Sequence, residues 1–83
     1  MRIKFVKKPV VIEAIQYLTD NIFEIIEFLG DFPHSYLPSD QILVLRTLEG
    51  DMLVKHGDFV IKGAFGEFYP CKPDIFKETY SEV

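Results

Sequence analysis

The chain has 83 residues, enough for one domain, and we expect residues 1–83 to fold as a single unit with a thin core that favours a homo-oligomer. Its hydrophobic fraction of 48%, with eight Phe and four Tyr, excludes a disordered chain. One cysteine excludes an internal disulfide, and no apolar run reaches the roughly 18 residues of a membrane span, so we expect a cytoplasmic protein without a membrane partner.

Charge is distributed unevenly along the sequence. Arg2, Lys4, Lys7 and Lys8 stand in the first eight residues without an acid, and the remaining chain carries five basic against thirteen acidic side chains, a net charge of −8. Broad nucleic-acid binding requires a basic face that displaces counterions from phosphates, which an acidic body does not provide. The early lysines leave two interpretations open: the solvated face of an edge strand, or a local anion site.

The first predicted element is an extended segment at the edge of a sheet. Residues 3–6 and 10–18 are rich in β-branched and aromatic side chains, and they are separated by Pro9, which has no N–H to donate to a ladder. Side chains alternate between the two faces of a strand. We predict that the face toward the core is formed by Val10, Ile12, Ala14 and Gln16, and the opposite face by Val11, Glu13, Ile15 and Tyr17.

A helix is predicted over about residues 20–29. Capping side chains at Thr19, Asp20 and Asn21 precede apolar residues with helical spacing, and Gly30 occupies the position of a C-terminal cap. Residues 31–40 contain two prolines and two serines, which predicts a loop. This loop is either a plain connector or a segment with a binding or gating role.

From Gln41 onward the apolar residues alternate with a period of two, which predicts strands. Glycine-containing turns at 49–51, 57–58 and 63–66 divide this part into a four-strand antiparallel meander, and Pro73 is placed to begin a closing helix. The sequence therefore predicts an α+β fold in the order β-α-β-β-β-β-α. In it, a small curved antiparallel sheet of about five strands is covered by one amphipathic helix, and a short C-terminal helix seals an edge.

Catalytic and metal chemistry find little support in the sequence. Cys71 precedes a helix start and neighbours Lys72, an arrangement that can lower a thiol pKa, although a lone cysteine at a strand end is commonly a small buried apolar residue. The two histidines, His34 and His56, are isolated from Cys71 and from each other, so no metal-ligand spacing is present. We expect neither a metal nor another cofactor.

Ligand binding has better candidates. Arg46 and Lys62 are lone cations within apolar strands, and each would contact an anionic ligand or pair with an acid across the sheet. Cations supply charge, aromatic rings supply stacking and an amide supplies orientation. The candidate set is Arg46, Lys62, Lys72, Gln16, Tyr17 and Tyr69.

Three pieces of the chain carry a resemblance: residues 7–14, residues 47–50, and residues 57–76 with the string Gly-Glu-Phe-Tyr-Pro-Cys-Lys-Pro-Asp-Ile-Phe. Together they resemble short proteins encoded in bacteriophage and prophage genomes of Firmicutes and other bacteria. Such proteins often carry Pro where His56 stands and Tyr or Trp where Phe59 stands. The resemblance implies a phage origin and the cytoplasm of a bacterial host.

Three functional hypotheses follow. The first is a non-enzymatic binding module that sequesters a small anionic or nucleotide-type molecule in counter-defence. The second is an inhibitor that binds a host protein through its acidic surface. The third is a small enzyme with Cys71 as its nucleophile.

Overall fold

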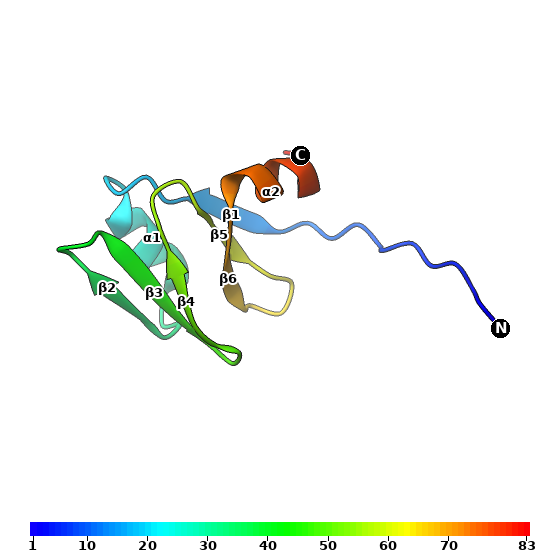
Figure 1. The fold of residues 1–83 in the computed structure, drawn as a ribbon, viewed down its shortest axis with the longest axis horizontal. Helices are drawn as coiled ribbons and strands as arrows, with labels where there is room; N and C mark the ends of the chain where they lie inside the picture. Colours follow the sequence, from blue (N-terminus) through cyan, green and yellow to red (C-terminus); the bar gives the residue numbers. More distant parts are fainter.

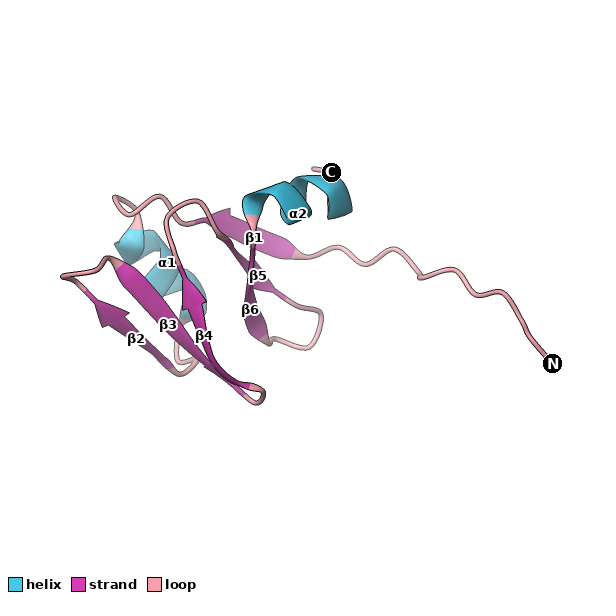
Figure 2. Ribbon diagram, in the orientation of Figure 1, coloured by secondary structure: helices cyan, strands magenta, loops and turns pink.

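The computed structural model describes residues 1–83, which form an α+β fold with two small antiparallel sheets and two helices (Figures 1 and 2). One sheet has the strand order β1-β5-β6 and the other β2-β3-β4. The elements are, in chain order, β1 (Glu13–Gln16), α1 (Ile22–Leu29), β2 (His34–Leu37), β3 (Ile42–Thr47), β4 (Gly50–Val54), β5 (Phe59–Lys62), β6 (Phe68–Cys71) and α2 (Pro73–Thr79).

The single five-strand sheet of the prediction is wrong. The β3–β4 and β5–β6 hairpins form, but β5 pairs with β1 and not with β4. The turn at Gly57 and Asp58 therefore carries the chain from one sheet to the other, with Gly57 at a φ of 94° that favours glycine. A turn signal in the sequence shows where a strand ends, but it does not show which other strand the following strand pairs with.

A further strand lies inside the predicted loop. Within residues 31–40, β2 pairs with β3 through His34↔Leu45, Ser35↔Val44, Tyr36↔Leu43 and Leu37↔Ile42. The two prolines lie just outside this four-residue strand, where their missing N–H groups interrupt no pair. The order of elements is thus β-α-β-β-β-β-β-α, one strand more than predicted.

The predicted strand at residues 3–6 does not form. Residues 1–12, here called the N-terminal arm, have no secondary structure and project away from the body in an extended path (Figure 1). This arm accounts for the elongated dimensions of the molecule, 53 × 25 × 19 Å. Because β5 ends at Lys62, opposite Glu13, residues before Glu13 have no strand beside them.

One hydrophobic core is shared by both sheets and α1. It consists of Tyr17, Ile25, Leu29, Leu43, Leu45, Val54, Val60 and Phe68. The predicted orientation of the first strand is corrected here, since Ile15 and Tyr17 face this core. A buried tyrosine needs a partner for its hydroxyl, and the O–H of Tyr17 donates to the carbonyl oxygen of Gln41 at 2.8 Å.

The closing helix packs on the face of the β1-β5-β6 sheet opposite the shared core. The ring of Phe76 on α2 stacks on Phe59 with centroids 3.8 Å apart, and Tyr80 lies 5.0 Å from Phe76. Ile61, two residues after Phe59 and on the same face of β5, is fully buried. Both helices are too short to cross a bilayer.

Candidate functional site

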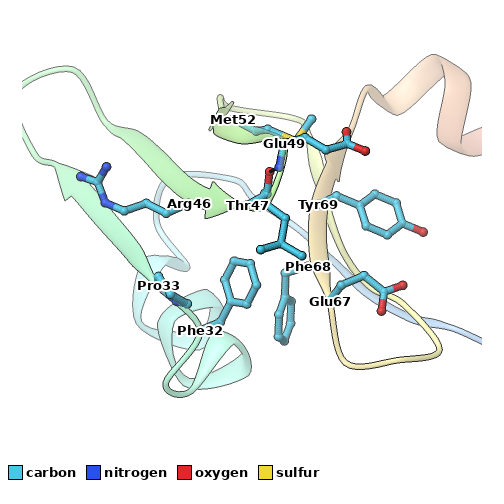
Figure 3. A pocket seen from close by; sticks show the side chains of 10 residues that line it. Phe32, Pro33, Arg46, Thr47, Glu49, Met52, Glu67, Phe68 and Tyr69 are labelled. Carbon is cyan, nitrogen blue, oxygen red and sulfur yellow. Dashed lines mark hydrogen bonds between the residues drawn. The ribbon is translucent and has the colours of Figure 1, made fainter.

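A groove opens between the two sheets, where the tip of the β3–β4 hairpin approaches β6 (Figure 3). Its volume is about 590 Å³. Ten residues from both sheets and from the segment after α1 line it: Phe32, Pro33, Arg46, Thr47, Leu48, Glu49, Met52, Glu67, Phe68 and Tyr69. The groove is thus assembled by tertiary packing and belongs to no single element.

The middle of the groove is apolar. Phe68 forms its floor on β6, where the residue is nearly fully buried, and its ring centroid lies 5.1 Å from that of Phe32. Leu48 lies at the tip of the hairpin turn and is fully exposed. In Figure 3 the Phe32 and Phe68 rings lie side by side in the groove. A partner could therefore bury apolar surface here without displacing the core.

Charged groups lie at the edge of the groove. The Arg46 guanidinium points away from its middle in Figure 3 and donates to the Asp51 carboxylate at 2.9 Å and to the Ser35 hydroxyl at 2.8 Å. The carboxylate of Glu67 accepts the N–H of Phe65 at 3.0 Å. Glu49 contributes a second carboxylate from the hairpin turn. Because Arg46 is already paired with an acid, the edge of the groove favours cationic groups on a partner.

Two of the predicted ligand contacts, Gln16 and Tyr17, lie where the chain passes from one sheet to the other. The N–H of Tyr17 donates to the Asp58 carbonyl at 2.8 Å, and its own carbonyl accepts the N–H of Gly57 at 2.7 Å. The side-chain amide of Gln16 donates to the Gly57 carbonyl at 3.0 Å. Burial, with a smaller contribution from Tyr36, raises the pKa of Tyr17 to about 12.

Lys72 belongs to the same region. Its ammonium group donates to both carboxylate oxygens of Asp58 at 3.4 Å, and one of these oxygens also accepts the N–H of Lys55 at 3.0 Å. Asp58 is the one buried charged residue of the protein. We call this cluster of Gln16, Tyr17, Lys55, Gly57, Asp58 and Lys72 the junction, since it connects the two sheets and the start of α2.

The remaining predicted contacts are Lys62 and Tyr69. The Lys62 ammonium lies 6.0 Å from the centroid of the Phe68 ring, on the side of the sheet that faces the core. Tyr69 lines the groove, and burial together with Tyr80 raises its pKa to about 12. The structure therefore places Arg46 and Tyr69 at the groove, Gln16, Tyr17 and Lys72 at the junction, and Lys62 at neither.

Cys71 lies beside the junction and is half-buried. Its thiol donates to the Lys72 carbonyl at 3.6 Å. Burial raises the pKa of the Cys71 thiol, and the nearby Asp58 and Asp74 raise it further. A raised pKa lowers the thiolate fraction at neutral pH, which is the opposite of what a nucleophile requires. No group of three or more His, Cys, Asp or Glu side chains lies close enough together to hold a metal ion.

The residues that sequence reasoning missed are the apolar ones of the groove, mainly Phe32, Leu48 and Met52. One signal was available for Leu48, because a leucine next to Glu49-Gly50 in a tight turn has no core within reach. No family model, curated protein or solved structure matches this chain. The groove itself is therefore the basis for a functional proposal.

Proposed function

We propose that the protein is a non-enzymatic binding module whose groove takes an apolar side chain that a protein partner presents next to Lys or Arg. The observation that carries the proposal is the combination of an open apolar groove with carboxylates at its edge. The resemblance to phage proteins is the ground for taking the partner to be a protein of the bacterial host, which binding would inhibit.

The apolar lining supports a side chain as the ligand. A volume of about 590 Å³ lies within the ~300 to 1,000 Å³ that binding pockets usually have. Leu48 is fully exposed, and covering such a side chain is worth roughly 1.5 to 3 kcal/mol. Phe32 and Phe68 add two rings against which an aliphatic or aromatic side chain packs well.

The charge distribution supports basic neighbours in the partner. Glu49 and Glu67 lie at the edge of the groove, and the chain beyond its first eight residues carries a net charge of −8. Charge complementarity of this kind accelerates encounter and selects among partners more than it adds affinity. The proposed partner segment therefore carries Lys or Arg on one or both sides of its apolar residue.

A second candidate is the sequestration of a small anionic or nucleotide-type molecule. It rests on Arg46 and Tyr69, a cation and a ring from the predicted contact set, which both contribute to the lining of the groove although their side chains point away from its middle in Figure 3. Arg46 would have to exchange its carboxylate partner, Asp51, for the ligand. We rank this candidate second for that reason.

Peptide selection separates the two candidates. Random heptapeptides displayed on phage are selected against the immobilised protein, and nucleotides are screened by thermal shift. We expect the selected peptides to share an apolar residue beside Lys or Arg, and Leu48→Ser to abolish their binding. Phe65→Ser is the matched control, because Phe65 is as exposed as Leu48 and lies outside the groove.

Two results would count against the main proposal. Selected peptides without basic residues would show that the carboxylates do not contribute to recognition. Peptide binding that survives Leu48→Ser would show that the groove is not the binding site. A rise in melting temperature with a nucleotide, lost in Arg46→Ala, would establish the second candidate in its place.

A further inference from the structure

We propose that two copies of the chain form a dimer in which the N-terminal arm of each copy pairs antiparallel with the outer edge of β1 in the other. The β1-β5-β6 sheets of the two copies would then join into one continuous sheet. This interface is separate from the groove, so the dimer and the proposed binding function are tested independently of each other.

The outer edge of β1 has free hydrogen-bonding groups. β1 is the edge strand of its sheet and pairs with β5 alone. Tyr17 directs both its N–H and its carbonyl toward the chain leading into β5, so by alternation Ile15 and Glu13 do the same. The backbone groups of Ala14 and Ile12 therefore point away from β5. At the far end, the Gln16 carbonyl accepts the side-chain amide of Asn21 at 2.8 Å, which closes the edge there.

The arm has the properties of a strand without a partner. All of residues 1–11 are exposed, including Ile3, Phe5, Val6, Val10 and Val11. An exposed apolar segment next to a free strand edge is the usual setting for strand exchange between copies. Figure 1 shows the arm leading away from its own body in the direction of β1, so a second molecule can lie along both.

The positions of Lys7, Glu13 and Pro9 select one register for the pairing of the arm with β1 of the second copy. When Val10 lies opposite Val10 of the second copy, Lys7 lies opposite Glu13 and Phe5 opposite Ile15. In this register every second residue, Ala14, Ile12 and Val10, directs its backbone N–H and carbonyl across the interface. Pro9 is not one of them and so falls at a non-hydrogen-bonded position. A proline is tolerated there, since its missing N–H would point to solvent.

The side chains of the arm also meet complementary groups. Beside Ile15, a shallow notch between β1 and α1 is lined by Glu24, Glu27 and Phe28. Phe5 of the second copy would lie on the same face as Ile15, over this notch. Lys7 would lie between Glu13 and the carboxylates of α1. The basic arm of one copy is thus matched to an acidic and apolar surface of the other.

Cysteine cross-linking tests the register in the full chain. In a Cys71→Ser background, Val10→Cys places two thiols across the dimer axis at a Cα separation of about 5.5 Å, which suits a disulfide. Val11→Cys is the matched control: it is the adjacent exposed valine, but in this register it lies diagonal to its copy at about 7 to 8 Å. With oxidised glutathione we expect cross-linked dimer from Val10→Cys and little from Val11→Cys.

Charge reversal tests the Lys7–Glu13 pair by sedimentation equilibrium. Because the pair occurs twice per dimer, Lys7→Glu or Glu13→Lys should raise the dimer dissociation constant about tenfold, and combining them should restore it. Lys77→Glu, a reversal on α2, should have no such effect. The proposal is overturned if the unmodified chain remains monomeric at millimolar concentration, if both cysteine variants cross-link equally, or if the double reversal fails to restore association.

Discussion

The junction and the groove lie at two places where the sheets approach each other, and they use opposite kinds of side chain. The junction joins the sheets through Asp58, Tyr17 and Gln16, whose polar groups are hydrogen-bonded within the protein. The groove is lined in its middle by Phe32, Leu48 and Phe68. Gln16, Tyr17 and Lys72, which were predicted as ligand contacts, are hydrogen-bonded within the protein, whereas Leu48 is open to a partner.

This difference shows that a small domain uses its few buried polar interactions to fix its own fold. With 83 residues and a thin core, a buried hydrogen-bond network such as the junction fixes the relative placement of two sheets. An apolar groove is the surface that then remains for binding. Changes in the junction should lower stability, and changes at Leu48, the fully exposed residue of the groove, should alter binding alone.

The largest effect is expected from Asp58→Ala. The substitution removes the acceptor of the Lys55 N–H and leaves Lys72 without its partner, at a side chain that is 6% exposed. Losing a charge-assisted hydrogen bond at a buried site costs about 2 kcal/mol. Urea unfolding followed by circular dichroism measures the loss.

Two further variants show how much of the cost of Asp58→Ala comes from the ion pair with Lys72. Asp74→Ala in the exposed first turn of α2 should cost about 0.5 kcal/mol, since it removes only a favourable interaction with the helix dipole. Lys72→Met should cost under about 1 kcal/mol, because the Lys72 side chain is 59% exposed and its ion pair is screened by water. If Lys72→Met were as damaging as Asp58→Ala, the ion pair and not the Lys55 N–H would hold the junction.

A smaller effect is expected from Tyr17→Phe. The change keeps the ring in the core and deletes the hydrogen bond to the Gln41 carbonyl, which costs about 1 kcal/mol at neutral pH. The pH dependence gives a second readout. The pKa of Tyr17 is raised to about 12, so the neutral side chain contributes stability below pH 10 that is lost as the pH rises toward 12.

Wild type and Tyr17→Phe should therefore converge as the pH rises. Wild type loses the contributions of both Tyr17 and Tyr69, whose pKa values are about 12, whereas the variant loses that of Tyr69 alone. Urea midpoints at pH 7, 10 and 11 measure this. A gap that stays constant over that range would mean that Tyr17 titrates normally in the folded protein.

The elements with a strong local signal were predictable. The helix expected at residues 20–29 is present as Ile22–Leu29, and the alternation after Gln41 gave the strands of both hairpins. The division into two sheets was not predictable, because the pairing of β5 with β1 joins residues more than forty positions apart. The strand β2 was missed because four residues between prolines carry too little periodicity, and its pairing with β3 decides its structure.

The candidate site was predictable only in part. Arg46 and Tyr69 were identified by residue type and do line the groove, whereas Gln16, Tyr17 and Lys72 were chosen for the same chemical reasons and lie in the junction. Residue type indicates which interactions a side chain can make, but the fold decides whether they are made internally. Phe32 lies in the segment after α1 and Phe68 lies on β6, so their approach depends on how these distant parts of the chain pack.

The smallest effect on stability is expected from Leu48→Ser. Leu48 is fully exposed at the hairpin tip, and the turn is held by backbone and Thr47 contacts, including the Thr47 hydroxyl that donates to the Gly50 carbonyl at 2.7 Å. Surface substitutions of this kind usually change stability by no more than about 0.5 kcal/mol. Urea unfolding of Leu48→Ser should therefore match wild type, as should the control Phe65→Ser. A loss above about 1 kcal/mol would mean that Leu48 packs against the body, and a leucine already covered by its own chain has no apolar surface to offer a partner.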